Sequence, residues 1–397
     1  MMCNTNGYRL ITSILNAFLW GEKITLPDEV DWKLLNSLAD INSISGIVGF
    51  VLQQSGISVL PPEMQRKYDD DYNSTIAMSV IRDEAMKALM DQFDQQEIDR
   101  LLFKGYVVKD LYPVPELRTF GDIDFAIRPG DRSKSNHLML SNGYRPADDW
   151  EPVYAYQNEL EHYEIHTEII DSDLGGQFKL QEYFRNFWSH SIKVDDHTYL
   201  LETGYHLLYL LAHLAKHLYG SGAGVRMYLD IAFFIREYRD EIDWEHFKRE
   251  VSHLKMNRFV NTVFAAVQTW FHVPSPISIK APKEGFLERF LEFTLNGGVF
   301  GFADRKGAEV ELRQNMKNRK VNRTSTFMRR AFPSASTLAP RYTYLQSKPW
   351  LLPAAWVHRL FKKKNTTTAY LKETKAIFSA DEAKLHQMRE LYDIIGL

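Results

Sequence analysis

The chain has 397 residues, of which 45% are hydrophobic and 25% charged, and its net charge is −3. These values are typical of soluble globular proteins and exclude a largely disordered chain. The single cysteine, Cys3, excludes an intrachain disulfide. The N-terminal stretch lacks the pattern of a secretory signal, and no apolar run approaches the roughly 18 residues that suggest a membrane span. We therefore expect a cytoplasmic protein.

A helical N-terminal domain is predicted over residues 1–97. Leucines at helical spacing follow Asp31, a residue suited to capping a helix N-terminus. After two prolines, a longer helix is expected from about Pro62 to Gln96. Its buried face is predicted to carry Met78, Ile81, Ala85, Leu89 and Phe93.

An α+β unit is predicted over residues 98–200. A short apolar run ends at Lys104-Gly105, and the alternating stretch DIDFAIRP (122–129) has strand character and stops at a Pro-Gly pair. The other expected elements are a short helix over 106–112, a loop over 113–121, a helix over 131–144 that ends at Asn142-Gly143, and a hairpin of strands over 152–158 and 162–170.

The remainder is predicted to be mainly helical. Residues 201–285 would form a helical domain that completes a nucleotide cleft, and residues 286–397 a basic, mostly helical extension. From 302 to 364 there are 15 Lys and Arg against 3 Asp and Glu, interleaved with aromatic residues. Such a surface either complements the acidic remainder of the chain as a solvated face or makes a weak contact with an anionic membrane surface or nucleic acid.

Two aspartates of the predicted strand at 122–129 are the first candidate site. Alternate residues of a strand point to the same face, so Asp122 and Asp124 project together while Ile123 faces the core. Two adjacent carboxylates repel unless a cation lies between them, and their hard oxygens suit Mg²⁺ or Mn²⁺. The alternative is a solvated strand end beside a turn.

The strand at 162–170 supplies further carboxylates. Glu164, His166 and Glu168 share one of its faces. A third carboxylate beside the two aspartates would complete a clamp for two metal ions, as used in phosphoryl and nucleotidyl displacement. The alternative is an exposed face of a two-stranded ribbon.

Histidines of the following helical segment lie on one face. His213 and His217 are four residues apart, next to Lys216. Three interpretations stay open: a basic wall, with Arg226, that faces phosphates; buried histidines with satisfied partners; or a zinc site completed by Glu164 or Asp230. Arg226 and Asp230, also four apart, could instead pair with each other.

The motifs together resemble those of a broad, uncharacterised bacterial nucleotidyltransferase family of the DNA polymerase β-type superfamily. The resemblance covers most of the chain, including FPSASTLAPRYTYL (332–345) and KPWLLPAAWVHRLF (348–361). The matching elements in the first part are Lys104-Gly105, Leu111-Tyr112-Pro113, Glu116-Leu117-Arg118, Gly121-Asp122-Ile123-Asp124, EIHTE (164–168), and HLAKH (213–217) followed by Arg226 and Asp230.

The resemblance implies a polymerase β-like core, a small mixed sheet with helices, flanked by helical N- and C-terminal domains. It implies that three carboxylates bind Mg²⁺ or Mn²⁺ and carry the catalysis. Two are Asp122 and Asp124, and the third is Glu164 as first choice or Glu168 as second. The bound triphosphate would bridge those ions, and Lys104-Gly105 would open a helix whose N–H groups cradle phosphate. The further residues expected to bind the nucleotide are Arg118, Gly121, His213, Lys216, His217 and Arg226.

The implied activity is transfer of a nucleoside monophosphate from an NTP to an acceptor hydroxyl, with release of pyrophosphate. The acceptor could be a small molecule, a saccharide, a protein or RNA. Superfamily members with demonstrated transfer often carry Gly-Ser where this chain has Gly105-Tyr106. The alternative is therefore a catalytically degenerate nucleotide-binding or interaction protein that contacts anionic surfaces through its basic C-terminal section.

Overall fold

The computed structural model describes residues 5–57, 60–150, 152–220, 222–299, 312, 322–339, 342–362, 377–379 and 381–397. The chain divides into two compact units. The larger comprises residues 1–217 and 223–301, and the smaller comprises 218–222 and 302–397. The finer division into four domains stays a prediction. Within the described ranges no helix is long and apolar enough to cross a membrane.

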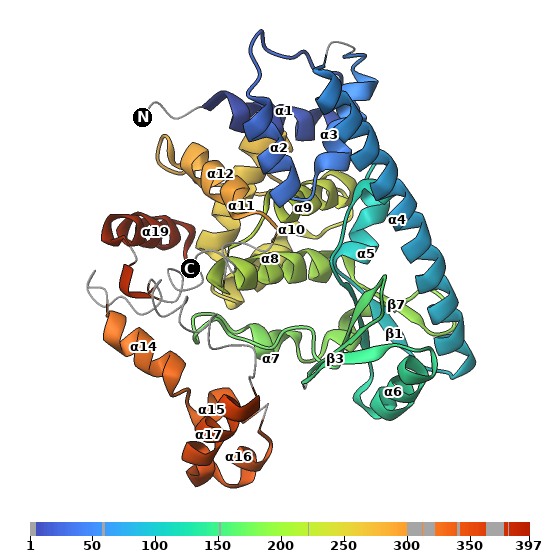
Figure 1. Ribbon diagram of the computed structural model, residues 1–397, viewed down its shortest axis with the longest axis vertical. Helices are drawn as coiled ribbons and strands as arrows, with labels where there is room; N and C mark the ends of the chain where they lie inside the picture. The colour runs from blue at the N-terminus through green and yellow to red at the C-terminus, as the bar shows by residue number, and fades with distance from the viewer. Residues whose placement is uncertain are drawn as a thin grey trace. The chain divides into compact units, whose positions relative to one another are not determined.

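The larger unit is built on a seven-stranded mixed sheet (Figure 1). The strand order is β3-β4-β5-β2-β1-β7-β6, with β2 parallel to β5 and antiparallel to β1. The predicted class, a small mixed sheet with helices and flanking helical regions, is confirmed. The strands are β1 (Arg100–Leu102), β2 (Ile123–Ile127), β3 (Arg145–Trp150), β4 (Val153–Gln157), β5 (His162–His166), β6 (Ser191–Lys193) and β7 (Thr198–Leu201).

One face of the sheet is covered by α4 (Pro62–Gln95) and α6 (Arg132–Ser141). Phe93 of α4 meets Phe125 of β2 edge-on, with ring centroids 5.3 Å apart. Because Ile123, Phe125 and Ile127 all join this apolar cluster, Asp124 between them must point to the opposite face.

The predicted buried face of the long helix is partly wrong. Leu89 and Phe93 are buried as expected, but Ile81 is 43% exposed and Met86 is fully buried. Which residues of α4 are buried here depends on the apolar core formed with the sheet and α6. That core includes residues from the C-terminal half of α4 only.

The opposite side of the strands meets α8 (Thr203–Gly220). Tyr209 of α8 packs edge-on against Phe103, which directly follows β1, with ring centroids 5.2 Å apart. The helix α9 (Val225–Tyr238) stacks Phe233 on Tyr112 at 4.2 Å. These contacts place α8 and α9 beside the strand ends from which Asp124 projects.

The N-cap expected at Asp31 is confirmed because its side chain accepts a hydrogen bond from the backbone N–H of Leu34 (3.0 Å). The other helices are α1 (Thr5–Trp20), α2 (Trp32–Ile41), α3 (Ser45–Gln54), α5 (Gly105–Val108), α7 (Leu180–Phe184), α10 (Trp244–His253), α11 (Asn257–Phe271) and α12 (Phe286–Gly297), with 3₁₀ turns η1 (Lys109–Leu111), η2 (Pro115–Leu117), η3 (Pro129–Asp131) and η4 (Phe187–His190).

The smaller unit is helical, as predicted, where it is described. An apolar cluster of Leu338, Tyr342, Leu345 and Ala355 holds its short helices together, while Trp350 is 73% exposed. Part of the basic section 302–364 lies outside the described residues, so its contact with anionic surfaces stays a prediction. The helices are α14 (Arg323–Ala331), α15 (Ala335–Leu338), α16 (Tyr344–Ser347), η5 (Pro349–Leu351), α17 (Leu352–Lys362) and α19 (Glu382–Ile395).

Candidate active site

Three strand ends bring the predicted carboxylates together. In the parallel pairing of β2 with β5, Asp124 lies directly beside Glu164. In the antiparallel pairing of β1 with β2, Leu102 lies beside Phe125, so the chain leaving β1 delivers Lys104 to the same place. Lys104 and Glu164, which are 20 and 40 positions from Asp124 in the sequence, thus meet it because of the strand register.

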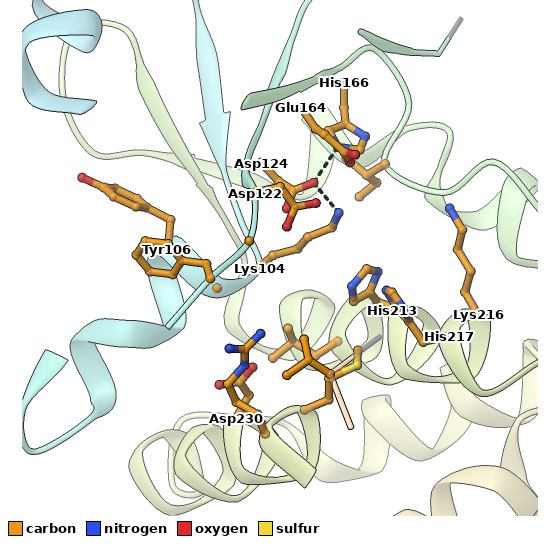
Figure 2. A pocket seen from close by; sticks show the side chains of 18 of the residues that line it. Lys104, Tyr106, Asp122, Asp124, Glu164, His166, His213, Lys216, His217 and Asp230 are labelled. Atoms are coloured by element: carbon orange, nitrogen blue, oxygen red, sulfur yellow. Dashed lines mark hydrogen bonds and ion pairs between the residues drawn. The ribbon is translucent and has the colours of Figure 1, made fainter. Parts of the chain in front are cut away.

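Asp124 is the centre of a group of three side chains that could hold a metal ion (Figure 2). The ligand atoms of Asp124, Glu164 and His166 all lie within 4.8 Å of one another. The His166 Nε2 is 2.8 Å from Asp124 Oδ1 and 3.7 Å from Glu164 Oε2. His166 was not predicted as a metal ligand, although strand alternation places it on the face of Glu164.

Two other expected carboxylates lie in the wall of the same cavity but outside this group. Asp122 precedes β2 and is half-buried, whereas Glu168 is exposed beyond the end of β5. The structure therefore brings Glu164, rather than Glu168, to Asp124. Asp171, which the sequence analysis does not single out, also lines the cavity.

The charges of the carboxylates differ strongly. Burial alone would raise the pKa of Asp124, but Lys104 and His166 outweigh it and hold that pKa well below its usual range. Burial and the neighbouring Asp124 raise the pKa of Asp122. Burial, Asp124 and Asp122 together raise the pKa of Glu164 to about 7. At neutral pH the group thus has one firmly ionised carboxylate and one that is half protonated.

Gly105 is required by a close approach of Arg118. A Cβ at position 105 would lie 2.1 Å from the Arg118 Nη1. Although 17 positions separate Gly105 from Asp122, both line one cavity because the intervening loop folds back and lays this guanidinium over the turn. A Cβ at Gly121, in contrast, would meet no atom within 4 Å, so space stays open beside the aspartates.

The buried guanidinium of Arg118 and the half-buried one of Arg226 both lie near Asp230 at the floor of the cavity. Arg118 pairs with Asp230 through Nη2 (2.7 Å) and Nε (3.2 Å), and the Tyr112 hydroxyl donates to the same carboxylate (2.7 Å). Arg226 donates to the Thr119 hydroxyl. Burial and Arg118 lower the pKa of Arg226 to about 10, so it is charged at neutral pH. Asp230 thus holds Arg118, and the floor keeps a net positive charge.

The histidines of α8 line the cavity but are not basic. Burial, followed by Lys104, lowers the pKa of His213 well below its usual value and that of His217 to about 4. Among the described residues neither histidine belongs to a group of three potential metal ligands. The expected basic wall therefore takes its charge from Lys216, which pairs with Asp171 at 2.6 Å, and from Arg226.

Comparison with known protein families agrees with this geometry. The model of an uncharacterised nucleotidyltransferase family matches residues 28–272, which include all the strands and the whole cavity except Val299. The chain belongs to this nucleotidyltransferase family. No curated protein and no solved structure matches the chain.

The residues of this nucleotidyltransferase site fit a divalent ion. Carboxylate oxygens suit Mg²⁺ and Mn²⁺, and an imidazole nitrogen is compatible with Mn²⁺. The buried Nδ1 of His166 has no hydrogen-bond partner within the described residues, while its Nε2 contacts Asp124. The carboxylate oxygens of Asp124 and Glu164, with the nearby Nε2 of His166, are a donor set that a divalent ion would fit.

The raised pKa of Glu164 predicts a pH-dependent affinity for the metal. Below its pKa of about 7 the carboxyl is protonated, and a proton must leave before the oxygen can bind an ion. We expect the affinity for Mn²⁺, measured by titration calorimetry, to rise by up to about tenfold per pH unit below pH 7 and to level off above it.

Glu164→Gln and Glu168→Gln form a matched pair for this measurement. Glu164→Gln should bind Mn²⁺ weakly at every pH, and Glu168→Gln should keep the wild-type pH profile because Glu168 lies outside the group of three. A wild-type affinity that is flat between pH 5.5 and 8 would contradict the assignment of Glu164.

Proposed function

We propose that this protein transfers a nucleoside monophosphate from a nucleoside triphosphate to a hydroxyl of an acceptor and releases pyrophosphate. The observation that carries the proposal is the in-register pairing of Asp124 and Glu164 on parallel strands at the wall of a cavity of about 330 Å³. A site of this size, with a few convergent polar groups, suits a small ligand.

The metal site would be formed by Asp124 and Glu164, with Asp122 at its edge and His166 holding Asp124. Divalent ions bound there would neutralise the developing charge of the phosphates and align the attacking and leaving oxygens. His166 fixes the orientation of the Asp124 carboxylate through its Nε2. The ions require both carboxylates in their ionised forms.

The phosphates would lie toward the cavity floor. Arg226 is held there with its charge uncompensated by a carboxylate of its own, and Lys216 approaches from α8. Guanidinium groups favour phosphate because they offer several donors in one plane. The apolar part of the wall, which would receive the nucleoside, consists of Val153, Ile169, Leu210, Met227 and Val299.

The transfer exchanges one bond at the α-phosphorus for another and moves one proton. The acceptor oxygen forms a bond to the α-phosphorus, and the bond from that phosphorus to the β-phosphate breaks, so pyrophosphate leaves. The acceptor proton would pass to the ionised Glu164 carboxylate beside the ions and from there to water.

The proposal is tested by incubating the purified protein with each α-³²P-labelled nucleotide, Mg²⁺ or Mn²⁺, and a cell extract. Label that appears on a small molecule, a saccharide, a protein or RNA names the acceptor class. No label on any acceptor with any of the four nucleotides and either ion would contradict transfer.

One observation favours a second candidate, a degenerate nucleotide-binding protein. Lys104 forms a buried ion pair with Asp124, and a protein that kept this pair permanently would not need a metal. The two candidates differ in thermal stability: the enzyme predicts stabilisation by a triphosphate that depends on Mg²⁺, and the binding protein predicts stabilisation without it.

A further inference from the structure

We propose that Lys104 regulates the metal site: its ammonium occupies Asp124 in the metal-free protein and moves to the triphosphate when a divalent ion takes its place. The inference rests on the proposed nucleotidyltransferase function and adds to it a coupling between metal and nucleotide. Figure 2 shows the Lys104 amine between the two aspartates and the histidines of α8.

The ion pair between Lys104 and Asp124 is buried. The Lys104 Nζ contacts Asp124 Oδ1, and their side chains are 13% and 7% exposed. The same Oδ1 also forms a hydrogen bond of 2.8 Å with the Nε2 of His166. An ion that binds this oxygen must therefore displace one of its two partners, and an ion that binds either oxygen of Asp124 is repelled by the ammonium beside it.

Lys104 acts on the whole acidic group. Its positive charge stabilises the ionised forms of Asp122, Asp124 and Glu164. It also disfavours protonation of His213 and His217 across the cavity. A single ammonium thus holds together carboxylates that would otherwise repel one another, which is the task of a bound divalent ion.

The other cations of the cavity have partners outside the metal site. Lys216 pairs with Asp171, and Arg118 pairs with Asp230. Arg226 donates to Thr119. Among the cations lining the cavity in the described part of the chain, Lys104 is therefore the one whose ion pair involves a predicted metal ligand.

The backbone keeps Lys104 in place while its side chain is free to move. Its φ of 58° and ψ of −141° are unusual for a residue with a Cβ and are kept only where the surroundings enforce them. The following Gly105 packs under Arg118, which fixes the turn. Four methylene groups still let the ammonium leave Asp124 and enter the cavity that it lines.

The exchange predicts opposite effects of one substitution on two ligands. Lys104→Met keeps the length of the side chain but removes its charge, so an ion no longer has to displace or approach a cation. Metal affinity should therefore rise. Triphosphate affinity should fall, because the phosphates lose a cation. General damage to the fold would weaken both.

The test compares wild type, Lys104→Met and Lys216→Met. Binding of Mn²⁺ alone is measured by electron paramagnetic resonance, and binding of ATP, GTP, CTP and UTP at saturating Mn²⁺ is measured by calorimetry. We expect Lys104→Met to bind Mn²⁺ at least about tenfold more tightly and the preferred triphosphate at least about tenfold more weakly. Lys216→Met removes the same charge from a pair with Asp171 and should change the Mn²⁺ affinity by less than about threefold.

A measurement on the wild type keeps the inference testable if Lys104→Met fails to fold. In lysine acetylation followed by mass spectrometry, Lys104 should be protected in EDTA and several-fold more reactive when Mn²⁺ is added. Lys109 serves as the reference, and its reactivity should not change because it pairs with Asp83 outside the cavity. Equal reactivity with and without Mn²⁺, or a Lys104→Met protein that binds both ligands more weakly, would overturn the exchange and leave the proposed function standing. A wild type that binds neither Mn²⁺ nor any triphosphate would overturn both.

Discussion

Replacing Asp124 with asparagine is expected to lower nucleotidyl transfer at least about a thousandfold, because the amide removes the one carboxylate that is firmly ionised in the metal group. Asp124 is the residue that contacts Glu164, His166 and Lys104 at once. The measurement is the initial rate of α-³²P transfer at saturating Mg²⁺, with the folded fraction checked by circular dichroism.

Asp83→Asn provides the matched control for this effect. Asp83 also pairs with a buried lysine, Lys109, but it lies outside the residues that line the cavity. This variant should keep the transfer rate within about twofold of wild type, since it breaks a similar ion pair without touching the site. If Asp124→Asn and Asp83→Asn behaved alike, the large loss could not be assigned to metal binding.

Replacing Asp230 with alanine is expected to have the largest effect on stability. It leaves Arg118 buried without its carboxylate, beside the half-buried Arg226, and removes the partner of the Tyr112 hydroxyl. Breaking a buried ion pair on one side typically costs about 3–5 kcal/mol. The change should appear as a lower free energy of unfolding in urea at pH 7.

Two further variants distinguish the cost of an unpaired buried charge from a general loss of stability. Asp171→Ala breaks the more exposed pair with Lys216 and should cost no more than about 1 kcal/mol. The double change Arg118→Met/Asp230→Leu removes one buried cation together with its partner, so it should lose less stability than Asp230→Ala alone. An Asp230→Ala loss as small as that of Asp171→Ala would show that water in the cavity solvates the guanidiniums.

Local sequence patterns predicted the elements that carry the site. Alternation in DIDFAIRP predicted β2 with Asp124 turned away from the core, and the Asn142-Gly143 pair predicted the end of α6, where Gly143 has a φ of 81°. Such signals are read from neighbouring residues, so they do not depend on the rest of the fold.

Features that depend on long-range pairing could not be predicted. No local pattern predicted a strand at β3, β6 or β7, and β7 forms a strand because it pairs with β1, about 100 positions earlier. Arg118 could have paired with many carboxylates, and only the packing of α9 beside the loop selects Asp230. In the same way, burial in the wall of the cavity and the charge of Lys104, rather than residue type, make His213 neutral.

The position of the transferred phosphorus tests the central claim most directly. Parallel reactions with α-³²P- and γ-³²P-labelled forms of the preferred nucleotide, with Mg²⁺ and a cell extract, would be run with wild type and Asp124→Asn. The account predicts that the acceptor gains α-label but not γ-label, that pyrophosphate appears in equal amount, and that Asp124→Asn does neither. Transfer of the γ-label would instead make the protein a phosphotransferase, and equal labelling with Asp124→Asn would contradict a metal site at Asp124.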